Sequence, residues 1–390
     1  MDARPERKPV QRSSRARRSI IAGAVLAGSL CGAVAASSEA SASVKRVQPG
    51  RFSVNWHEQL TRAELLEYAP RERSRPAVHA AHGWVFVADR FGKVRSLEPS
   101  GEKRWKIDAG GPIDAGLIVQ GDTLYVATAR GLILCLDAEA GEELWRYQTR
   151  AELGTTPTYH DGRLLVPSLA DSLFALDVGD GELLWFHRRR RLDDLTIRGA
   201  ARTVVEGSVA VTGFSDGAVI AFDVNDGNTL WSMQVGTGGF KDVDATPVIH
   251  EGVVYVVSYS GELLALDLET GRKIQRASVP EGAVRMESKG NKLFIAGPGF
   301  VSAHTAKNGG MVWRTGLDGG TPSDLRIHAG VLYLGTEEGP LVGLCASTGR
   351  PLAAFGTGNG VAAGPVRADS GVWAWSNGGW LYHLSLPSFD

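Results

Sequence analysis

Short apolar runs alternate with polar turns along most of the chain, and this pattern predicts β-strands. In one representative stretch the expected strands are Ile113–Val119, Thr123–Ala127, Leu132–Asp137 and Leu144–Gln148. The runs are rich in Val, Leu and Ile, and no stretch of helical periodicity separates them. The pattern therefore indicates an all-β protein.

One unit recurs along the chain: an apolar strand, a short polar turn that ends in Gly, and a Trp four residues later. The clear copies are Gly101/Trp105, Gly141/Trp145, Gly181/Trp185, Gly227/Trp231 and Gly309/Trp313, and the degenerate copies are Gly271/Gln275 and Gly349/Ala353. Four short strands in about 40 residues is the period of β-propeller blades. We expect each repeated Trp to be structural, with its ring between two sheets and its N–H bonded to a carbonyl of the neighbouring blade.

The two ends of the chain predict how the ring closes. The strand around Trp56 stands alone, whereas Val361–Arg367, Val372–Trp375 and Trp380–Leu386 supply three strands without a fourth. Pairing of these two ends would complete an eighth blade. We therefore expect an eight-bladed β-propeller over residues 52–390, with four antiparallel strands per blade.

The first 42 residues have the organisation of a secretory signal peptide. Basic residues precede an apolar run from Ile20 to Ala36, and small residues follow up to Ala42. We place cleavage after Ala42, with Ala35 as the second choice, and assign residues 43–51 to a linker. An uncleaved membrane anchor is the alternative. The mature chain, with a net charge of about −5, is expected in the periplasm.

Two features of this leader leave the route of export and the membrane attachment open. Arg17-Arg18 resembles a twin-arginine signal, although an ordinary basic leader has the same composition. Cys31 is a candidate for lipidation, but the bulky Leu30 before it argues against cleavage there. The basic run Arg188–Arg191 is either a solvated blade edge or a patch for anionic lipid, which would give peripheral membrane association.

Composition and spacing give little support for nucleic-acid binding, metal binding or catalysis. The whole chain has a net charge of −1 and three cysteines, which argues against nucleic acid and against a disulfide scaffold. The acidic turn Asp223–Gly227 resembles part of a calcium loop but lacks the closing glutamate. The nine histidines are scattered, and spacing identifies no catalytic group. We expect no metal, no cofactor and no enzymatic activity.

The two longest repeats are consecutive, and each is long between its Trp and the next blade, over Trp185 to Ala200 and Trp231 to Pro247. Extra length in a repeat protein tends to form loops on one face, often the binding face. Arg198 and Asp244 each lie 13 residues after the Trp of their repeat, so the loops should lie side by side. The expected surface consists of Leu195, Ile197, Arg198, Asp242 and Asp244. The alternative is that the charged residues only pair with one another and brace the loops.

The repeats "LYVATARGLILCLDAEAGEELW" and "VYVVSYSGELLALDLETGRKI" resemble the pyrroloquinoline-quinone-type propeller family. The segments 195–199, "LTIRG", and 242–248, "DVDATPV", further resemble two loops of the BamB family of propeller subunits in outer-membrane β-barrel assembly. This resemblance implies a non-catalytic scaffold, which binds the periplasmic (POTRA) domains of BamA and assists nascent outer-membrane β-barrel proteins. It also implies that Leu195, Ile197, Arg198, Asp242 and Asp244 contact BamA. A quinone-dependent dehydrogenase and a periplasmic sensor or carbohydrate-binding propeller are the alternatives.

Overall fold

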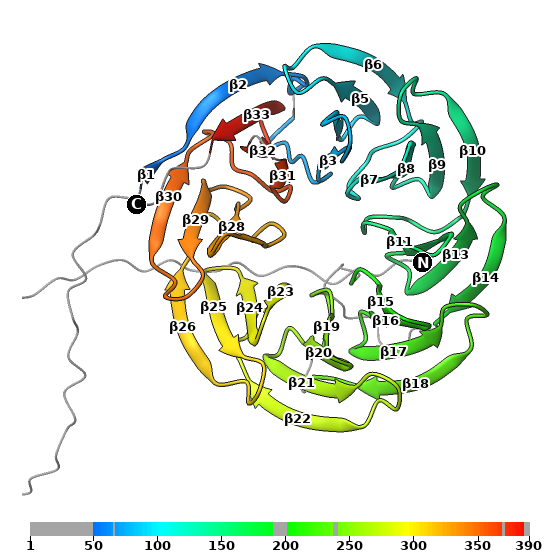
Figure 1. The fold of residues 1–390 in the computed structure, drawn as a ribbon, viewed down its shortest axis with the longest axis vertical. Helices are drawn as coiled ribbons and strands as arrows, with labels where there is room; N and C mark the ends of the chain where they lie inside the picture. The colour runs from blue at the N-terminus through cyan, green and yellow to red at the C-terminus, as the bar shows by residue number, and fades with distance from the viewer. Residues whose placement is uncertain (1–49, 65–66, 190–200, 237–240, 369–370, 386–390) are drawn as a thin grey trace, which may run out of the picture. The chain divides into compact units, whose positions relative to one another are not determined.

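The computed structural model describes residues 50–64, 67–189, 201–236, 241–368 and 371–385. These residues form eight sheets arranged in a ring (Figure 1). The prediction of an eight-bladed, all-β propeller is therefore confirmed. The predicted signal peptide and the lipidation candidate Cys31 lie outside the described residues. Within the described ranges, no helix is long and apolar enough to cross a membrane.

Each blade contains an innermost strand, two middle strands and an outermost strand. Blade 1 comprises β3 (Ala77–Val78), β4 (Val85–Ala88), β5 (Lys93–Leu97) and β6 (Lys103–Asp108), and blade 2 comprises β7 (Ile118–Gln120), β8 (Thr123–Ala127), β9 (Leu132–Asp137) and β10 (Glu143–Gln148). Blade 3 comprises β11 (Thr158–His160), β12 (Arg163–Pro167), β13 (Ser172–Asp177) and β14 (Leu183–Arg188), and blade 4 comprises β15 (Val204–Glu206), β16 (Val209–Gly213), β17 (Ala218–Asp223) and β18 (Thr229–Gln234). Blade 5 comprises β19 (Val248–His250), β20 (Val253–Val257), β21 (Glu262–Asp267) and β22 (Lys273–Ser278), and blade 6 comprises β23 (Arg285–Lys289), β24 (Lys292–Gly297), β25 (Phe300–Thr305) and β26 (Met311–Gly316). Blade 7 comprises β27 (Arg326–His328), β28 (Val331–Leu334), β29 (Leu341–Cys345) and β30 (Pro351–Phe355). Blade 8 comprises β31 (Val366–Ala368), β32 (Gly371–Trp375), β33 (Trp380–Ser385) and the N-terminal β2 (Ser53–Gln59).

The middle strands are buried on both faces because every sheet packs between two neighbours. On β8, Leu124 and Val126 belong to the apolar core that blade 2 shares with blade 1. The alternate residues Tyr125 and Ala127 belong to the core shared with blade 3. Successive side chains of a strand point to opposite faces, so one apolar run supplies two interfaces. This explains why the middle strands are apolar without alternation.

The repeated tryptophans join each blade to the next. Trp145 on the outermost strand of blade 2 donates its Nε1–H to the Val178 carbonyl of blade 3, at 2.8 Å. Its ring also covers Gly181, where an added Cβ atom would lie 2.5 Å from Cε3 of the indole. The same donor and acceptor arrangement recurs in Trp105–Ala138, Trp185–Val224, Trp231–Leu268 and Trp313–Ala346. Wherever the preceding blade carries the Trp, the glycine of the repeat therefore leaves room for its indole.

A β-bulge aims each of these tryptophans at the neighbouring blade. On β10, Glu143 pairs with Leu136 and Trp145 with Cys135, so Leu144 is the additional residue. A bulge of this kind rotates the side chains that follow it. Trp145 is thereby buried, whereas Leu144 is 54% exposed. Equivalent register shifts occur on β14, β18 and β26.

The N-terminal strand closes the ring, as the sequence predicts. β2 pairs antiparallel with β33, with Trp56 opposite His383. Trp56 covers Gly101 of blade 1 in the way that the other indoles cover their glycines, and its ring meets Trp373 edge-on at 5.9 Å. The eighth blade therefore consists of strands from both ends of the described chain.

Two details differ from the expected strands. The short strand β1 (Gly50–Arg51) lies in the predicted linker and pairs parallel with β30, which gives blade 7 a fifth strand. The innermost strands are also shorter than predicted, since β7 begins at Ile118 rather than Ile113. The preceding backbone bonds to other blades: the Leu117 amide donates to the Arg75 carbonyl, and the Gly116 amide donates to the Thr156 hydroxyl.

The contact between Trp145 and Gly181 can be tested with a matched pair of glycines in blade 3. Gly181 (φ +76°) and Gly162 (φ +75°) have the same left-handed backbone, but a Cβ atom on Gly162 would meet no atom within 4 Å. Alanine at either position costs about 1 kcal/mol of backbone strain. We expect Gly181→Ala to lose about 1–3 kcal/mol more, because the methyl group overlaps the indole. Urea denaturation of both variants measures the difference, and equal midpoints would contradict the contact.

Removal of the closing strand should destabilise the whole ring. A mature chain without residues 43–58 lacks β1 and most of β2, including Trp56, and exposes the edge of β33. Loss of a packed Trp alone costs roughly 3–5 kcal/mol. We expect aggregation or a sharply lower melting temperature, measured by thermal denaturation with light scattering. A melting curve identical to that of the full mature chain would show that the ring does not depend on this closure.

Candidate functional site

The described ends of two long connections lie on the same face of the ring. Residues 189–203 join β14 to β15, and residues 235–247 join β18 to β19. Each connection leads from the outermost strand of one blade to the innermost strand of the next. The chain crosses every blade in the same direction, so all such connections reach the same face. The two are longer than the equivalent connections over residues 109–117 and 149–157.

The structure describes only part of the surface predicted from the sequence. Leu195, Ile197 and Arg198 lie outside the described residues, whereas Asp242 and Asp244 lie within them. The Asp242 side chain is buried, with 1% of its surface exposed, and Asp244 is partly buried. Whether the five residues form one surface therefore stays a prediction. Asp242 is therefore buried rather than exposed as expected, and Asp244 is only partly exposed.

Backbone contacts fix the aspartate-containing segment between blades 4 and 5. The Asp242 carbonyl accepts a hydrogen bond from the Tyr259 amide at 2.8 Å, and the Val243 amide donates to the Phe214 carbonyl at 3.3 Å. Val243 is fully buried, and an added Cβ on Gly213 would lie 2.7 Å from its carbonyl oxygen. Both blades therefore hold the segment that positions Asp244.

The Asp244 carboxyl group is poorly stabilised as an anion. Its burial raises its pKa to about 7, and the negative charges of Asp242 and Asp171 add to this effect, whereas Arg285 opposes it. Among the described residues, its Oδ1 atom has no hydrogen-bond partner. Asp171 belongs to blade 3 and accepts hydrogen bonds from the Ser215 amide and hydroxyl. Carboxyl groups from blades 3 and 5 thus influence one another, and a cation brought to Asp244 would stabilise its charged form.

The structure describes two residues of the basic run, Arg188 and Arg189. Arg189 makes an ion pair with Asp216 of blade 4, with 2.6 Å between Nε and Oδ2, and its side chain is 25% exposed. Arg188 is exposed at the end of β14, and Arg190 and Arg191 lie outside the described residues. Part of this run therefore braces blade 3 against blade 4.

Metal-ligating side chains do not cluster in the described ranges. These ranges contain no group of three or more His, Cys, Asp or Glu side chains that could hold a metal ion. Cys135 and Cys345 are free and belong to blades 2 and 7. Sequence reasoning missed Arg285, the cation that acts on Asp244. Its role depends on how blades 5 and 6 adjoin, and no local motif marks it.

The buried Asp244 should make stability depend on pH. Its pKa in the folded chain is about 7, above the ordinary 3.8, so the folded state binds the proton more tightly than the unfolded state. Folding stability contributed by this group is therefore lost as pH rises from about 4 to about 7. We expect Asp244→Asn to melt higher than the wild type, with a gap that grows from pH 4.5 to pH 8. The exposed Asp161→Asn serves as control, and a gap that stays constant with pH would contradict the assignment.

Comparison with known proteins agrees with the fold and the repeat. The family model described as outer membrane protein assembly factor BamB matches residues 90–286. The curated BamB of Shewanella oneidensis is 29% identical over 346 residues, which cover 81% of this chain and 85% of that protein. The crystal structure of BamB from Moraxella catarrhalis superposes with a TM-score of 0.73 at 19% identity, covering 86% of this chain and all of that one.

The fold is shared with enzymes as well. Quinohemoprotein alcohol dehydrogenase ADHIIG from Pseudomonas putida superposes with a TM-score of 0.68 at 13% identity, covering 88% of this chain and 80% of that one. At this identity the likeness concerns the fold alone. The family model matches half of the sequence, and this chain belongs to the family of the outer membrane protein assembly factor BamB.

Proposed function

We propose that this chain is a non-catalytic assembly factor for outer-membrane proteins, and that it docks on the periplasmic domains of BamA. The family match supports the general role, since the relatives are named as outer membrane protein assembly factors. The observation that carries the docking proposal is the pair of long connections, 189–203 and 235–247, whose described ends lie on one face of adjacent blades. The chain acts in the periplasm, at the outer membrane, after its leader is removed.

The chemistry of these connections suits a specific protein contact. Leu195 and Ile197 supply apolar area, Arg198 supplies a cation, and Asp244 supplies a carboxyl group that lacks full stabilisation. Apolar contacts beside charged groups are common at the centre of interfaces, where arginine is often a dominant residue. Asp242 and the buried Val243 keep the backbone of the second connection in place.

The outer rim offers a second surface, suited to client proteins. β10, β14 and β18 are the terminal strands of their sheets, so each has an unpaired backbone edge. Leu144 and Phe186 on these strands are 54% and 46% exposed. A nascent β-strand with apolar side chains can pair with such an edge by strand addition. This supports a role in handling outer-membrane β-barrel chains before they are inserted.

Docking can be tested with two arginines in equivalent connections. Arg198→Glu should leave the melting temperature unchanged but weaken binding to purified BamA by at least about 30-fold, because an unmatched charge in an interface costs 2 kcal/mol or more. Arg150→Glu is the matched control, since Arg150 is exposed in the shorter connection between β10 and β11. Isothermal titration calorimetry measures both. Wild-type affinity in a folded Arg198→Glu variant would refute the docking surface.

A further inference from the structure

Eight residues in equivalent positions surround the axis of the propeller. In every blade a hairpin turn joins the innermost strand to the second strand, and one residue of the innermost segment pairs with the second strand directly at this turn. Each of the eight residues lies four positions before that pairing residue in the sequence. We call these residues the central ring: Arg75, Gly116, Thr156, Arg202, Thr246, Arg285, Asp324 and Gly364. The ring contains three cations and one anion, although the mature chain as a whole is acidic. This local excess of positive charge is not explained by the docking surface.

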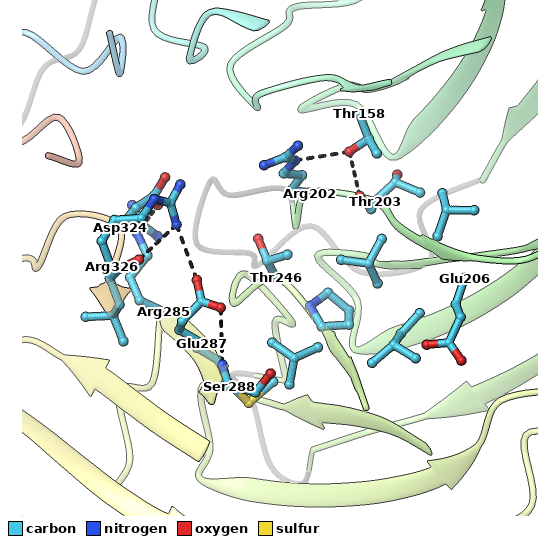
Figure 2. Close-up of a pocket in the computed structure, with 17 residues that line it drawn as sticks. Thr158, Arg202, Thr203, Glu206, Thr246, Arg285, Glu287, Ser288, Asp324 and Arg326 are labelled. Atoms are coloured by element: carbon cyan, nitrogen blue, oxygen red, sulfur yellow. Dashed lines mark hydrogen bonds and ion pairs between the residues drawn. The ribbon is translucent and has the colours of Figure 1, made fainter. Parts of the chain in front are cut away.

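A pocket of about 420 Å³ opens at the central ring, between the innermost strands of blades 3 to 7. Figure 2 shows the Arg202 guanidinium reaching inward on one side, with Asp324, Arg285 and Arg326 grouped on the other. The lining therefore combines three cations, three carboxylates and several hydroxyl groups from different blades, namely Arg202, Arg285 and Arg326 with Glu206, Glu287 and Asp324. A cavity of this size accommodates a small molecule and is too small for a folded partner.

The arginines on one side of the pocket have carboxylate partners. Arg326 pairs with Glu287 at 3.3 Å between nitrogen and oxygen. Asp324 is shared by Arg285 at 3.2 Å and Arg75 at 3.8 Å, so this group retains one net positive charge. Glu206, the remaining carboxylate of the lining, is exposed at the hairpin turn of blade 4.

Arg202 on the other side differs from these arginines. Within the part of the chain that the structure describes, no carboxylate oxygen lies within 4.0 Å of its guanidinium. Burial, followed by the charge of Arg75, lowers its pKa to about 10, and the charges of Asp324 and Glu287 partly oppose this effect. The Thr158 hydroxyl accepts a hydrogen bond from Arg202 Nε at 3.1 Å and donates one to the Thr203 carbonyl at 2.6 Å. Thr158 thus fixes the orientation of a cation whose charge has no direct partner.

We propose that this central pocket binds a small dianionic oxyanion, of the phosphate or short dicarboxylate class, between Arg202 and the Arg75–Arg285–Asp324 group. The planar guanidinium of Arg202 presents paired N–H donors that match two oxygens of such an anion. The anion supplies the negative charge that Arg202 lacks, and it neutralises the excess charge of the opposite group. The inference is independent of docking on BamA.

The test uses the purified mature chain in buffer without phosphate, at constant ionic strength. Inorganic phosphate and succinate are titrated separately, with binding measured by calorimetry and the melting temperature measured in parallel. The two arms distinguish a phosphate site from a dicarboxylate site. We expect one of these anions to bind saturably and to raise the melting temperature, whereas an equivalent amount of chloride should not.

Arg202→Gln should weaken anion binding by about tenfold or more, since it removes a charge-assisted contact. Without the anion this variant should melt close to the wild type, because among the described residues Arg202 loses only its hydrogen bond to Thr158 and no carboxylate within 4.0 Å. Arg146→Gln on the exposed β10 is the control and should bind the anion normally.

Should Arg202→Gln fail to fold, Thr158→Val tests the same site by freeing the guanidinium, and it should also weaken binding. Absence of binding by both anions to the wild type, or unchanged binding by a folded Arg202 or Thr158 variant, would overturn the proposal.

Discussion

The contact between the tryptophan of one blade and the glycine turn of the next is the interaction on which the ring depends. Each blade is a sheet with two apolar faces, so it is stable only between neighbours. The indole covers the glycine, and its N–H bonds to a carbonyl in the same turn region, as Trp145 does with Gly181 and Val178. The contact combines apolar burial with a directional hydrogen bond, and it therefore sets both the spacing and the relative orientation of adjacent blades.

The closed ring determines where chemistry can appear. The outermost strands all end, and the innermost strands all begin, on one face, and the connection between β18 and β19 carries Asp242 and Asp244 there. The innermost strands in turn bring Arg202, Arg285 and Asp324 around the axis from distant parts of the sequence. The two regions are linked, because Arg285 belongs to the central ring and also influences the Asp244 carboxyl group.

The repeat allowed the blade count and the closure to be predicted, because glycine and tryptophan recur at a period that only a propeller explains. Other features depend on contacts between blades, which no local pattern contains. Ala353 stands where a Trp would be expected, and the following blade takes its outermost strand from the N-terminus. Phe52 and β1 pack against this region instead. In the same way, the burial of Asp242 and the convergence of Arg202, Arg285 and Arg326 on one pocket depend on how neighbouring blades pack.

The central functional claim is that one face of the propeller docks on BamA. A photocrosslinking amino acid at position 195 would lie in the connection between blades 3 and 4. The same group at position 269 would lie in the exposed turn between β21 and β22, which is on the opposite face. Crosslinking is carried out in intact cells that express each full-length variant, and the products are identified by mass spectrometry. We expect a BamA adduct from position 195 and none from position 269, whereas adducts from position 269 alone would contradict docking through this face.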